Sequence, residues 1–457
     1  MTDCSTHCHA KRRHSAGMLF KSILTAAALC AALPLPAAAA KSPWTLPGVK
    51  KMALQNNPSM SEVKARIDSA AAEVARAKSA YWPSLDLGGS VQRNRARATR
   101  PARHYDNNTE YSLGLELSWT VFDGFQRKFE RLIAEFGLES AGAAEREAQR
   151  LLLQAASAAF LSALRAQDGM AIAKEDAAFN RILLDDARKR EEGGVATLSE
   201  VLNFELQVGN AEVDFIAAEQ EWKVSIIALG ALLAVSRDAL WESIELQPPQ
   251  GPQNLALEQS ELLAFARQHR PDLQIAEYNI AMADSAIAAA RSSWYPRLDF
   301  FADYGFTRQD SLRFNHDYDR EVYFGLAATW NIFNGFRTSA LLAQAQAERE
   351  AYVKVRDELL LRLEAQIRQH YLALESSRRQ LALQENILAT AKRIRDLVHH
   401  EYLGGTATIT RLNEVQSDVT ISASARSKAY IQVFYNLEEL LASSGKITDL
   451  EFVPVQE

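Results

Sequence analysis

The sequence predicts an α+β membrane protein, part membrane barrel and part helical tube, in which amphipathic strands lead into very long helices. The segment Trp119-Thr-Val-Phe-Asp-Gly-Phe125 stands at this junction, and it recurs 211 positions later as Trp330-Asn-Ile-Phe-Asn-Gly-Phe336. Upstream, apolar and polar residues alternate from Tyr111 to Val121, which is the period of a strand with one apolar face. Downstream, an alanine- and charge-rich run without proline until Pro248 favours helix.

Residues 1–40 have the pattern of an export signal. Positive charges precede a short apolar run at Ile23–Leu33, and Ala38-Ala39-Ala40 offers a cleavage site before Lys41. The apolar run is about half the length of a membrane-spanning helix. Met18 is an alternative start, because Lys21 would still supply a charged flank. We therefore expect a mature chain that begins at Lys41.

The composition of the mature chain excludes several classes of site. All three cysteines, Cys4, Cys8 and Cys30, lie in the leader, so the mature chain has no disulfide and no thiolate metal site. Leu29 stands where a lipidation signal needs a small residue, which argues against an anchor at Cys30. The leader carries four Lys/Arg and one Asp, so 51 Lys+Arg and 57 Asp+Glu become 47 and 56, a net charge of -9. This charge argues against general nucleic-acid binding.

The mature chain consists of two repeats. Tyr81-Trp82-Pro83 corresponds to Trp294-Tyr295-Pro296 at an offset of 213, and Gly193-Gly194 corresponds to Gly404-Gly405 at an offset of 211. A proline-rich linker, Gln247-Pro-Pro-Gln-Gly-Pro252, separates the halves. The predicted organisation is a signal peptide at 1–40, a first repeat at 41–246, a linker at 247–260, a second repeat at 261–446 and a C-terminal tail at 447–457.

Each repeat has the same predicted order of elements. A helix of about 25 residues ends at an aromatic-proline pair, because proline disfavours helix in the residue before it. Two strands and their loop follow, then a helix of about 65 residues to the glycine pair and a returning helix of about 38 residues. The short helices are predicted near Pro58–Tyr81 and Pro271–Trp294, the strands at Leu85–Arg93, Tyr111–Phe122, Leu298–Thr307 and Val322–Phe333, and the ends of the returning helices near Val235 and Ser444.

The helix lengths predict pairing. The short and the returning helix together nearly match the long one, so two short helices stacked end to end could pair along one partner about 100 Å long. Apolar residues that recur every seven positions indicate a coiled-coil seam. These seams are Val353, Leu360, Ile367, Leu374, Leu381 and Leu388 on one helix, Val201, Val208, Phe215, Trp222 and Leu229 on a second, and Leu412, Val419, Val433 and Leu440 on a third, where Arg426 interrupts the run.

The predicted strands require more than one chain. Strands of about ten residues are long enough to cross a membrane when tilted. Four strands cannot close a barrel, and an open edge within lipid leaves backbone amides without partners. Several chains must therefore share one barrel. Eight, twelve and sixteen strands all satisfy this argument.

The chain resembles the TolC-type outer membrane efflux protein family. The resemblance rests on the aromatic-proline pairs Trp82-Pro83 and Tyr295-Pro296, the turns Phe122-Asp123-Gly124 and Phe333-Asn334-Gly335, and the segments Gly194–Val201 and Tyr402–Ile409, in the same order in both halves. It implies a homotrimer in the outer membrane of a Gram-negative bacterium. A twelve-stranded barrel in outer-membrane lipid would continue into a twelve-helix periplasmic tunnel. Such a channel is the passive exit duct of a tripartite export system, with a periplasmic adaptor and an inner-membrane transporter as partners.

The resemblance also implies site residues. Gly193, Gly194, Gly404 and Gly405 would form the periplasmic tip that meets the adaptor, although glycines there also serve as ordinary helix C-caps. Glu200, Tyr402, Arg411 and Glu414 correspond to the pore constriction. Glu414 and Arg411 both stand where the family usually has aspartate, and Ala407 stands where a basic partner is common. The acidic ring of the entrance is therefore altered.

No residue pattern indicates an enzyme, a cofactor or a metal site. His399 and His400 are adjacent, so they project about 100° apart on a helix and chelate poorly. Five arginines between Arg93 and Arg103 are expected in an outward loop, either solvated or in contact with anionic lipid. Drug or metal efflux is the favoured function. Type I protein secretion is one alternative, and a periplasmic coiled-coil adaptor or scaffold is the alternative from another class.

Overall fold

The computed structural model describes residues 44–98, 104–235, 244–249, 258–316 and 319–448. All of these residues belong to a single compact unit that spans Pro43–Glu457. The predicted signal peptide, its cleavage site and residues 449–457 of the predicted tail lie outside the described residues. Within the described ranges, no helix combines the length and the apolar character that a membrane crossing requires.

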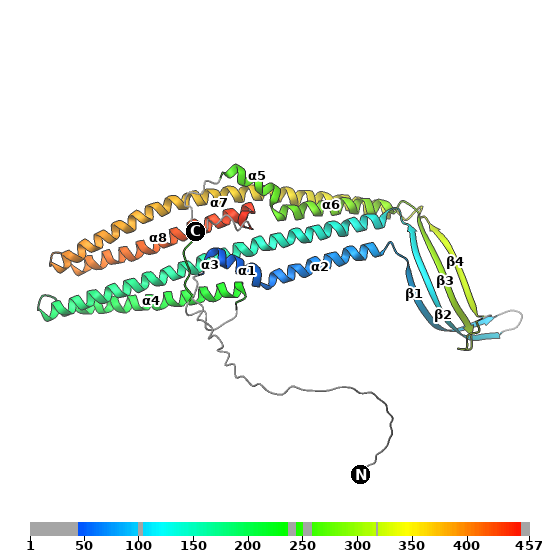
Figure 1. The fold of residues 1–457 in the computed structure, drawn as a ribbon, viewed down its shortest axis with the longest axis horizontal. Coiled ribbons are helices and arrows are strands. Elements are labelled where there is room, and N and C mark those ends of the chain that lie inside the picture. The colour runs from blue at the N-terminus through cyan, green and yellow to red at the C-terminus, as the bar shows by residue number, and fades with distance from the viewer. Residues whose placement is uncertain (1–43, 99–103, 236–243, 250–257, 317–318, 449–457) are drawn as a thin grey trace, which may run out of the picture. The chain divides into compact units, whose positions relative to one another are not determined.

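Long helices and one sheet make up the described chain (Figure 1). In chain order the elements are α1 (Leu46–Asn56), α2 (Pro58–Ser79), β1 (Ser84–Ala98), β2 (His104–Phe122), α3 (Gln126–Glu192), α4 (Leu198–Leu233), α5 (Gln259–His269), α6 (Pro271–Ser292), β3 (Arg297–Gln309), β4 (Arg320–Thr329), α7 (Arg337–Leu403), α8 (Ile409–Ser444) and the 3-10 helix η2 (Lys446–Thr448).

The two repeats are equal in their helices. α1 and α5 have 11 residues each, α2 and α6 have 22, α3 and α7 have 67, and α4 and α8 have 36. The first two pairs are offset by 213 positions and the last two by 211, so the difference falls in the hairpins between them. The structure therefore confirms the predicted long helices and their internal repetition.

Local sequence signals set the helix ends. The Asn57 side chain caps α2 by accepting a hydrogen bond from the Ser59 N–H at 2.9 Å, and Pro58 occupies the first turn. α3 and α7 each start after a glycine and a phenylalanine in the left-handed region. Phe125 has φ 69° and Phe336 has φ 66°. This conformation is rare for phenylalanine, so the same strained turn in both repeats marks the change from strand to helix.

The helices pack as the seams predicted. α2 and α4 both contact α3, while α6 and α8 both contact α7, so two shorter helices lie end to end along each long one (Figure 1). In the second repeat, Ile367, Leu374 and Leu381 of the α7 seam are buried in one cluster with Val433 and Leu440 of α8. The two halves join where α3 contacts α6 and α8.

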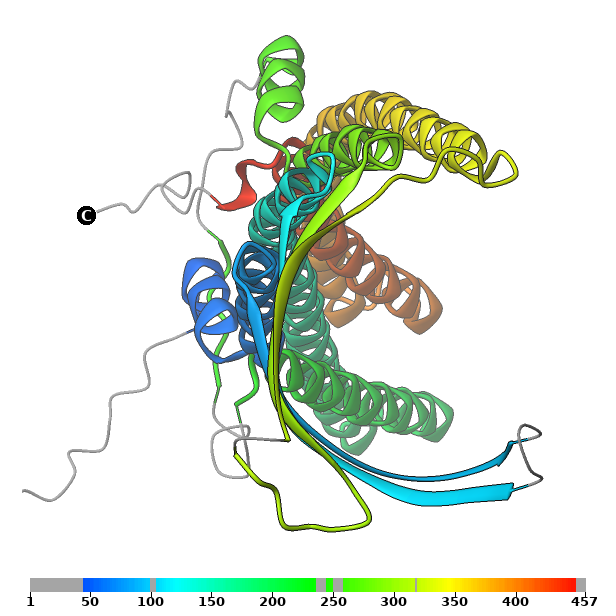
Figure 2. The ribbon, with the colours of Figure 1, turned by 90° about the vertical axis from the view of Figure 1, so that its right-hand side faces the viewer.

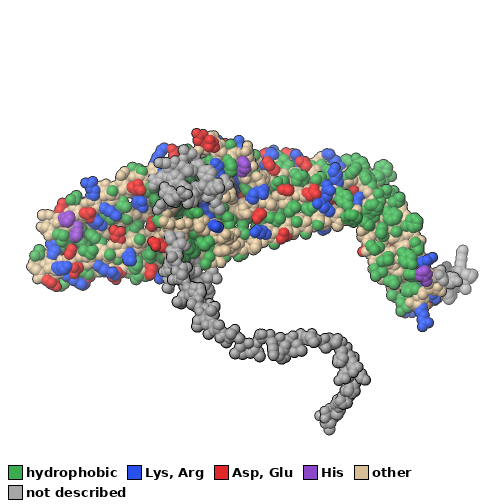
Figure 3. All heavy atoms as spheres, in the orientation of Figure 1, with side chains coloured by type: hydrophobic (Ala, Val, Ile, Leu, Met, Phe, Trp, Pro, Cys, Tyr) green, Lys and Arg blue, Asp and Glu red, His purple; other side chains and the backbone are tan. Residues whose placement is uncertain are grey.

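The four strands form one antiparallel sheet in the order β1-β2-β3-β4. Residues that pair across the sheet share a face. One row joins Leu87, Leu115, Tyr304 and Val322, and the next joins Asp86, Glu116, Asp303 and Tyr323. The sheet thus has one apolar and one largely polar face. Figure 3 shows hydrophobic side chains gathered over the sheet, whereas charged side chains are scattered over the helices.

Three predicted strand boundaries are wrong. β2 begins at His104 and not at Tyr111. β1 continues to Ala98, so Arg93, Arg95 and Arg97 lie on a strand and not in a loop. The ladder to β2 runs on to Ala98 because backbone pairing does not require the apolar alternation on which the prediction relied. β4 ends at Thr329 and not at Phe333, because its partner β3 begins at Arg297, the residue that pairs with Thr329. Residues 99–103 lie outside the described part.

Two helices were not predicted. α1 begins after Thr45, whose side chain accepts a hydrogen bond from the Gly48 N–H at 3.3 Å. α5 is its counterpart and already includes Gln259 and Ser260, which the prediction assigned to the linker. Both helices are short and directly precede a proline-initiated helix. The prediction missed them because 11 residues carry too little periodicity to stand out.

A buried ion pair connects α1 to the second repeat. Lys50 Nζ lies 2.6 Å from Glu438 Oε2 of α8, and the two side chains are only 3% and 9% exposed. The Ser157 hydroxyl of α3 donates to the same carboxylate oxygen at 3.0 Å. Three helices from both repeats therefore meet at one carboxylate. Removing one partner of a buried pair leaves an uncompensated charge, which costs much more than the loss of a surface pair.

We expect Lys50→Met to destabilise the folded chain by about 3–5 kcal/mol, because Glu438 loses its counter-charge in a buried site. Lys51→Met is the matched control, since Lys51 is the exposed neighbour on the same helix. Denaturant unfolding of the purified protein, followed by circular dichroism, measures both. Equal stability of the two variants would contradict a role for the ion pair, and Lys50→Met with Glu438→Leu should recover part of the loss.

Candidate functional site

The turns that join the long and returning helices form the candidate site. Gly194 has φ 73° and Gly405 has φ 75°, in the left-handed region where glycine is favoured. In the first turn the backbone N–H groups of Val195 and Ala196 donate to the Arg190 backbone carbonyl. In the second turn those of Thr406 and Ala407 donate to the Glu401 backbone carbonyl. Gly193 and Gly404 are the C-cap residues of α3 and α7. The predicted tip glycines thus have the conformation of a tight, repeated turn.

The two turns are tied together by Arg190. Its Nη1 donates to the backbone carbonyl of Tyr402 at 2.6 Å, and its guanidinium lies 4.6 Å from the centre of the Tyr402 ring. Phe204 of α4 meets the same ring edge-on, with ring centres 6.1 Å apart. A charge-assisted hydrogen bond and a cation–π contact therefore join the end of α3 to the end of α7.

Tyr402 is buried at this junction, with 2% of its surface exposed. Its hydroxyl and Oε2 of Glu200 are buried and have no hydrogen-bond partner in the described structure. Burial raises the pKa of the Tyr402 phenol, and the Glu200 carboxylate raises this pKa further, while Arg190 acts in the opposite direction. The phenol is therefore neutral at physiological pH.

The predicted constriction residues fall into two groups. Tyr402 lies in the interior between the two helix pairs, and Glu200 is half-buried with its Oε2 atom out of contact with solvent. Arg411 and Glu414 instead form an ion pair with N–O distance 3.2 Å one turn into α8, and both side chains are more than half exposed. Next to them, Asn413 Nδ2 donates to Asn203 Oδ1 of α4 at 2.9 Å. The tip thus has a buried group and an exposed group of polar residues.

The strand–helix turns differ between the repeats. Asp123 accepts hydrogen bonds from Arg127, the closer one at 2.7 Å from Nε, and Arg127 Nη1 donates to the Thr120 carbonyl at 2.6 Å. A β-carbon on Gly124 would lie 2.6 Å from the Ser292 carbonyl oxygen, so only glycine fits there.

The second turn is more open. Asn334 donates to the Thr338 hydroxyl at 2.8 Å, and nothing lies near a β-carbon built on Gly335. Phe122 and Phe333 each pack edge-on against the phenylalanine three residues on, Phe125 and Phe336. Phe122 is the last residue of β2, and the other five predicted turn residues lie between a strand and a helix. Among the described residues, a side chain at Gly124 would meet another part of the chain, whereas one at Gly335 would meet nothing.

The sequence prediction missed Arg190, the residue that connects the turns. One signal was available, because the repeat offset of 211 places Glu401 opposite Arg190 and Glu191 opposite Tyr402. The chemistry of the two tips is therefore unequal although their backbones match. An inequality of this kind in an otherwise symmetric pair indicates a contact specific to one repeat.

An amphipathic four-stranded sheet that continues into paired helices about 100 Å long defines a subunit of an envelope export channel. The family model described as "Outer membrane efflux protein" matches residues 49–235 and 262–446. The chain belongs to this family. It is a non-enzymatic outer-membrane exit duct of a tripartite export system, with most of its length in the periplasm.

Relatives and solved structures agree with this assignment. The chain is 24% identical over 430 residues to the outer membrane efflux protein BepC of Brucella suis, covering 94% of this chain and 91% of the relative. It is 24% identical over 398 residues to protein CyaE of Bordetella pertussis, with 87% and 83% covered. Its fold is similar to that of the CmeC outer membrane channel of Campylobacter jejuni, with TM-score 0.77, 16% identity and 88% and 85% of the two chains covered. The outer membrane protein VceC of Vibrio cholerae gives TM-score 0.74 at 18% identity, with 88% and 96% covered.

We expect Arg190→Gln to loosen the junction of the two turns, because one charge-assisted hydrogen bond to Tyr402 is lost. A bond of this type contributes about 1.5–3 kcal/mol, so amide hydrogen exchange near both turns should become at least tenfold faster. Arg188→Gln is the matched control, since Arg188 pairs with Glu205 on the surface at 2.7 Å and such pairs contribute little. Unchanged exchange in Arg190→Gln would show that this contact does not hold the tips together.

Proposed function

We propose that the chain acts as a homotrimer, in which three four-stranded sheets close one barrel and three sets of helices close one periplasmic tunnel. The sheet supports this proposal, because β1 and β4 each pair with one strand only in the described structure. An unpaired strand edge cannot face lipid, so another chain must cover both edges. β4 of one copy pairs with β1 of the next in a closed ring.

Repeat symmetry extends this argument to the helices. α3 of the first repeat contacts α8 of the second within one chain. The equivalent elements are α7 and α4, which lie at opposite ends of the group of helices in Figure 2. The contact that corresponds to α3–α8 is therefore made between α7 of one copy and α4 of its neighbour. The same reasoning applies to the strand–helix turns. Gly124 lies against Tyr295 within one chain, whereas nothing lies near a β-carbon on Gly335. Since Trp82 is the counterpart of Tyr295, Gly335 is proposed to lie against the residues around Trp82 of the next copy.

The surfaces of α4 and α7 suit such a contact. One face of α4 packs on α3, and the opposite face carries a stripe of exposed apolar residues, here called the α4 stripe: Leu198, Leu202, Leu206, Val213, Ile216, Val224 and Ile227. Between α7 and α8 lies an apolar groove of about 510 Å³, lined among others by Leu383, Ile387, Ile394 and Ile421. We propose that the α4 stripe of one copy packs against this groove of the next. The number three follows from the family.

We expect Ile216→Asp to reduce the trimer at least tenfold, because a carboxylate placed in an apolar interface lacks a partner and costs several kcal/mol. Ile182→Asp is the matched control. Ile182 of α3 is 55% exposed and Ile216 is 62% exposed, but α3 is flanked by α4 and α8 within its own chain. Native mass spectrometry of the detergent-solubilised protein reports the oligomer. A stable trimer of Ile216→Asp, or a folded wild-type monomer, would refute the proposed assembly.

We propose that the tip of the helices docks on a periplasmic adaptor, which connects the duct to an inner-membrane transporter. The exposed side chain of Val195 and the glycine turns support this, because they place apolar surface at the end of the first hairpin. Arg190, Tyr402 and Glu200 then hold the tip closed in the resting state. Arg411 and Glu414 are proposed to face the lumen in the trimer, where three copies of the pair set the field at the narrow end.

We propose that the cargo consists of small molecules rather than proteins. The names of several relatives support this choice: the pyoverdine export outer membrane protein OpmQ of Pseudomonas aeruginosa is 25% identical over 385 residues, and the putative multidrug resistance outer membrane protein MdtQ of Escherichia coli is 25% identical over 320 residues. Type I protein secretion is the alternative within the same architecture. The alternative that this chain is itself a periplasmic coiled-coil adaptor or scaffold is dropped, because the chain belongs to the outer membrane efflux protein family.

We expect a strain without this chain to become several-fold more susceptible to amphipathic dyes and antibiotics, because export across the outer membrane is lost. Complementation with the wild-type chain should restore resistance, and Ile216→Asp should not. The polypeptides in the culture medium should stay unchanged. Loss of a secreted polypeptide without a change in susceptibility would instead favour type I protein secretion.

A further inference from the structure

The face of the sheet that carries Leu87 and Tyr304 is apolar, and it ends in arginines. In the direction away from the helices, the first residue beyond its apolar part is Arg93 on β1, Arg308 on β3 and Arg320 on β4. The last apolar residues of this face on the three strands are Val91, Phe306 and Val322. Three of the four strands therefore place an arginine where the apolar face stops.

The arginines lie about one membrane thickness from the opposite edge of the apolar face. Near the helices, the indole N–H groups of Trp119 and Trp330 donate to backbone carbonyls at 3.0 and 3.1 Å, and tryptophan is typical of the boundary between lipid and water. Along β2, Trp119 lies ten residues from Thr109, the residue that pairs with Arg93. A tilted strand crosses a membrane in about 9–11 residues. Because the helices are periplasmic, the arginines lie at the outer leaflet of the outer membrane.

Strand tilt brings the three arginines to one depth. Relative to the row of Arg93, the row of Arg308 lies two residues nearer the helices and the row of Arg320 lies four residues nearer. For strands about 4.8 Å apart, a tilt of about 45° offsets residues of equal depth by about 1.5 residues per strand. The expected offsets from β1 are thus about three residues at β3 and about four at β4, close to those observed. The last apolar residues have the same offsets, as expected for an edge that follows the membrane surface.

Two of the three arginines have no acidic partner in the part of the chain that the structure describes. Arg93 and Arg320 are exposed, and no carboxylate of a described residue lies within ion-pair distance of either. Arg308 pairs with Asp319, whose Oδ2 lies 2.8 Å from Nη1. Figure 3 shows Lys and Arg side chains at this end of the sheet, beyond the hydrophobic surface. The end of the sheet therefore offers positive charge to a ligand.

The nearby acidic side chains that the structure describes do not compete for this charge. Glu110 and Glu321 lie in rows of the polar face, on the other side of the sheet. Asp310 accepts a hydrogen bond from the Thr109 backbone N–H at 2.7 Å. On the apolar face itself, the charged residues at paired positions are all arginines. A surface of one sign attracts ligands of the opposite charge.

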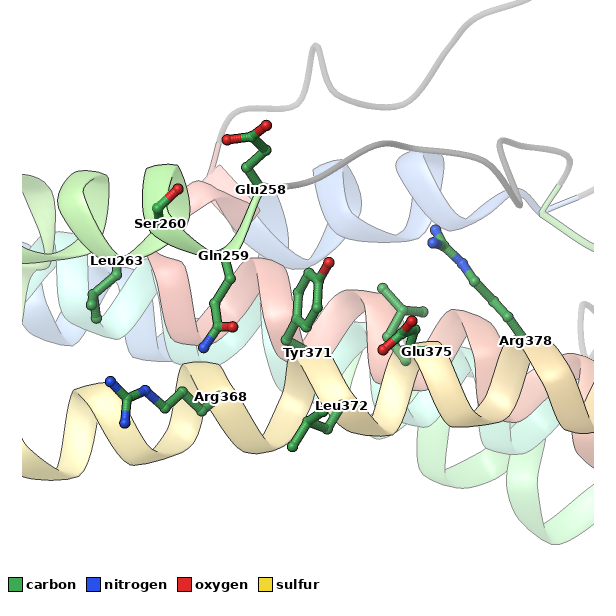
Figure 4. A pocket seen from close by; sticks show the side chains of 10 residues that line it. Glu258, Gln259, Ser260, Leu263, Arg368, Tyr371, Leu372, Glu375 and Arg378 are labelled. Carbon is green, nitrogen blue, oxygen red and sulfur yellow. The ribbon is translucent and has the colours of Figure 1, made fainter.

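The groove between α5 and α7 provides a contrast. Its lining holds Arg368 and Arg378 together with Glu258 and Glu375 (Figure 4). Arg368 also forms an ion pair with Glu364. Positive and negative groups occur together there, so the groove does not favour an anion. Arginines without acidic neighbours are instead a feature of the end of the sheet.

An amphipathic anion suits an apolar surface that stops at exposed arginines. A guanidinium group binds phosphate through two parallel hydrogen bonds. The exposed side chains of Val91 and Val322 lie directly beneath the arginines and can contact acyl chains. A lipid with phosphate groups at the head of its acyl chains therefore matches both parts of the surface.

We propose that Arg93, Arg308 and Arg320 bind the phosphate groups of lipid A, the phosphorylated glycolipid that anchors lipopolysaccharide in the outer leaflet. The acyl chains then lie along the apolar face, and the bound phosphates fix the depth of the barrel in the membrane. The three arginines belong to one sheet. This binding therefore does not depend on how many chains share the barrel.

Native mass spectrometry of the full-length protein in detergent tests the ligand. Lipid A that carries its phosphates should bind with a dissociation constant at least tenfold lower than dephosphorylated lipid A, because both make the same apolar contacts. Equal dissociation constants would overturn the proposal. So would phosphatidylglycerol binding as tightly as lipid A, since the arginines would then select no particular lipid. The same spectra report the number of chains, so a different assembly is distinguished from a loss of lipid binding.

Variants of the arginines test the site. Arg93→Gln with Arg320→Gln should raise the dissociation constant for phosphorylated lipid A at least tenfold and leave that for dephosphorylated lipid A unchanged, because only hydrogen bonds to phosphate are lost. The matched control is Arg368→Gln with Arg379→Gln, which removes the same charge from two exposed arginines of α7. An unchanged dissociation constant in the first variant, or an equal rise in the control, would place the phosphates elsewhere and overturn the proposal.

Discussion

The unpaired backbone at the two edges of the sheet is the constraint on which the rest of the structure depends. β1 and β4 each have one neighbouring strand, yet their apolar face is suited to lipid, where an unpaired N–H or C=O has no partner. The constraint is met only if copies of the chain pair edge to edge around a ring. Each helix connected to the sheet must then fit the same ring, which explains why the helices of the two repeats are equal in length.

Equivalent helices of the two repeats have the same length but different side chains at key contacts. Arg190 at the first tip has Glu401 as its counterpart, and Lys50, which is buried against Glu438, has Leu263 as its counterpart on α5. The repeated elements therefore fix the ring geometry, while the substitutions between repeats create contacts that occur once in each chain. The junction of Arg190 with Tyr402 is such a contact, and it connects the first hairpin of helices to the second.

The two strand–helix turns differ in how much of their packing is provided within one chain. Gly124 has no room for a β-carbon because the Ser292 carbonyl lies against it, whereas Gly335 has open space around it in a single chain. Both glycines have φ 65°. Since the conformations are the same, the difference lies in the neighbours, and the missing neighbour of the second turn belongs to the adjoining copy in the proposed ring.

The sequence by itself determined the repeats, the long helices and the four strands, because each depends on a local signal repeated over many residues: alternation, a seam of sevens, or proline and glycine at fixed offsets. It also placed the turn residues from Phe122 to Gly124 and from Phe333 to Gly335. Only the tertiary structure decided the end of β1, the start of β2 and the end of β4, since these depend on which residues of the partner strand are present. Likewise, only the fold separates the buried Tyr402 and the half-buried Glu200 from Arg411 and Glu414 on the surface. Burial and partners at a tip arise from contacts between residues about 200 positions apart, which no local pattern encodes.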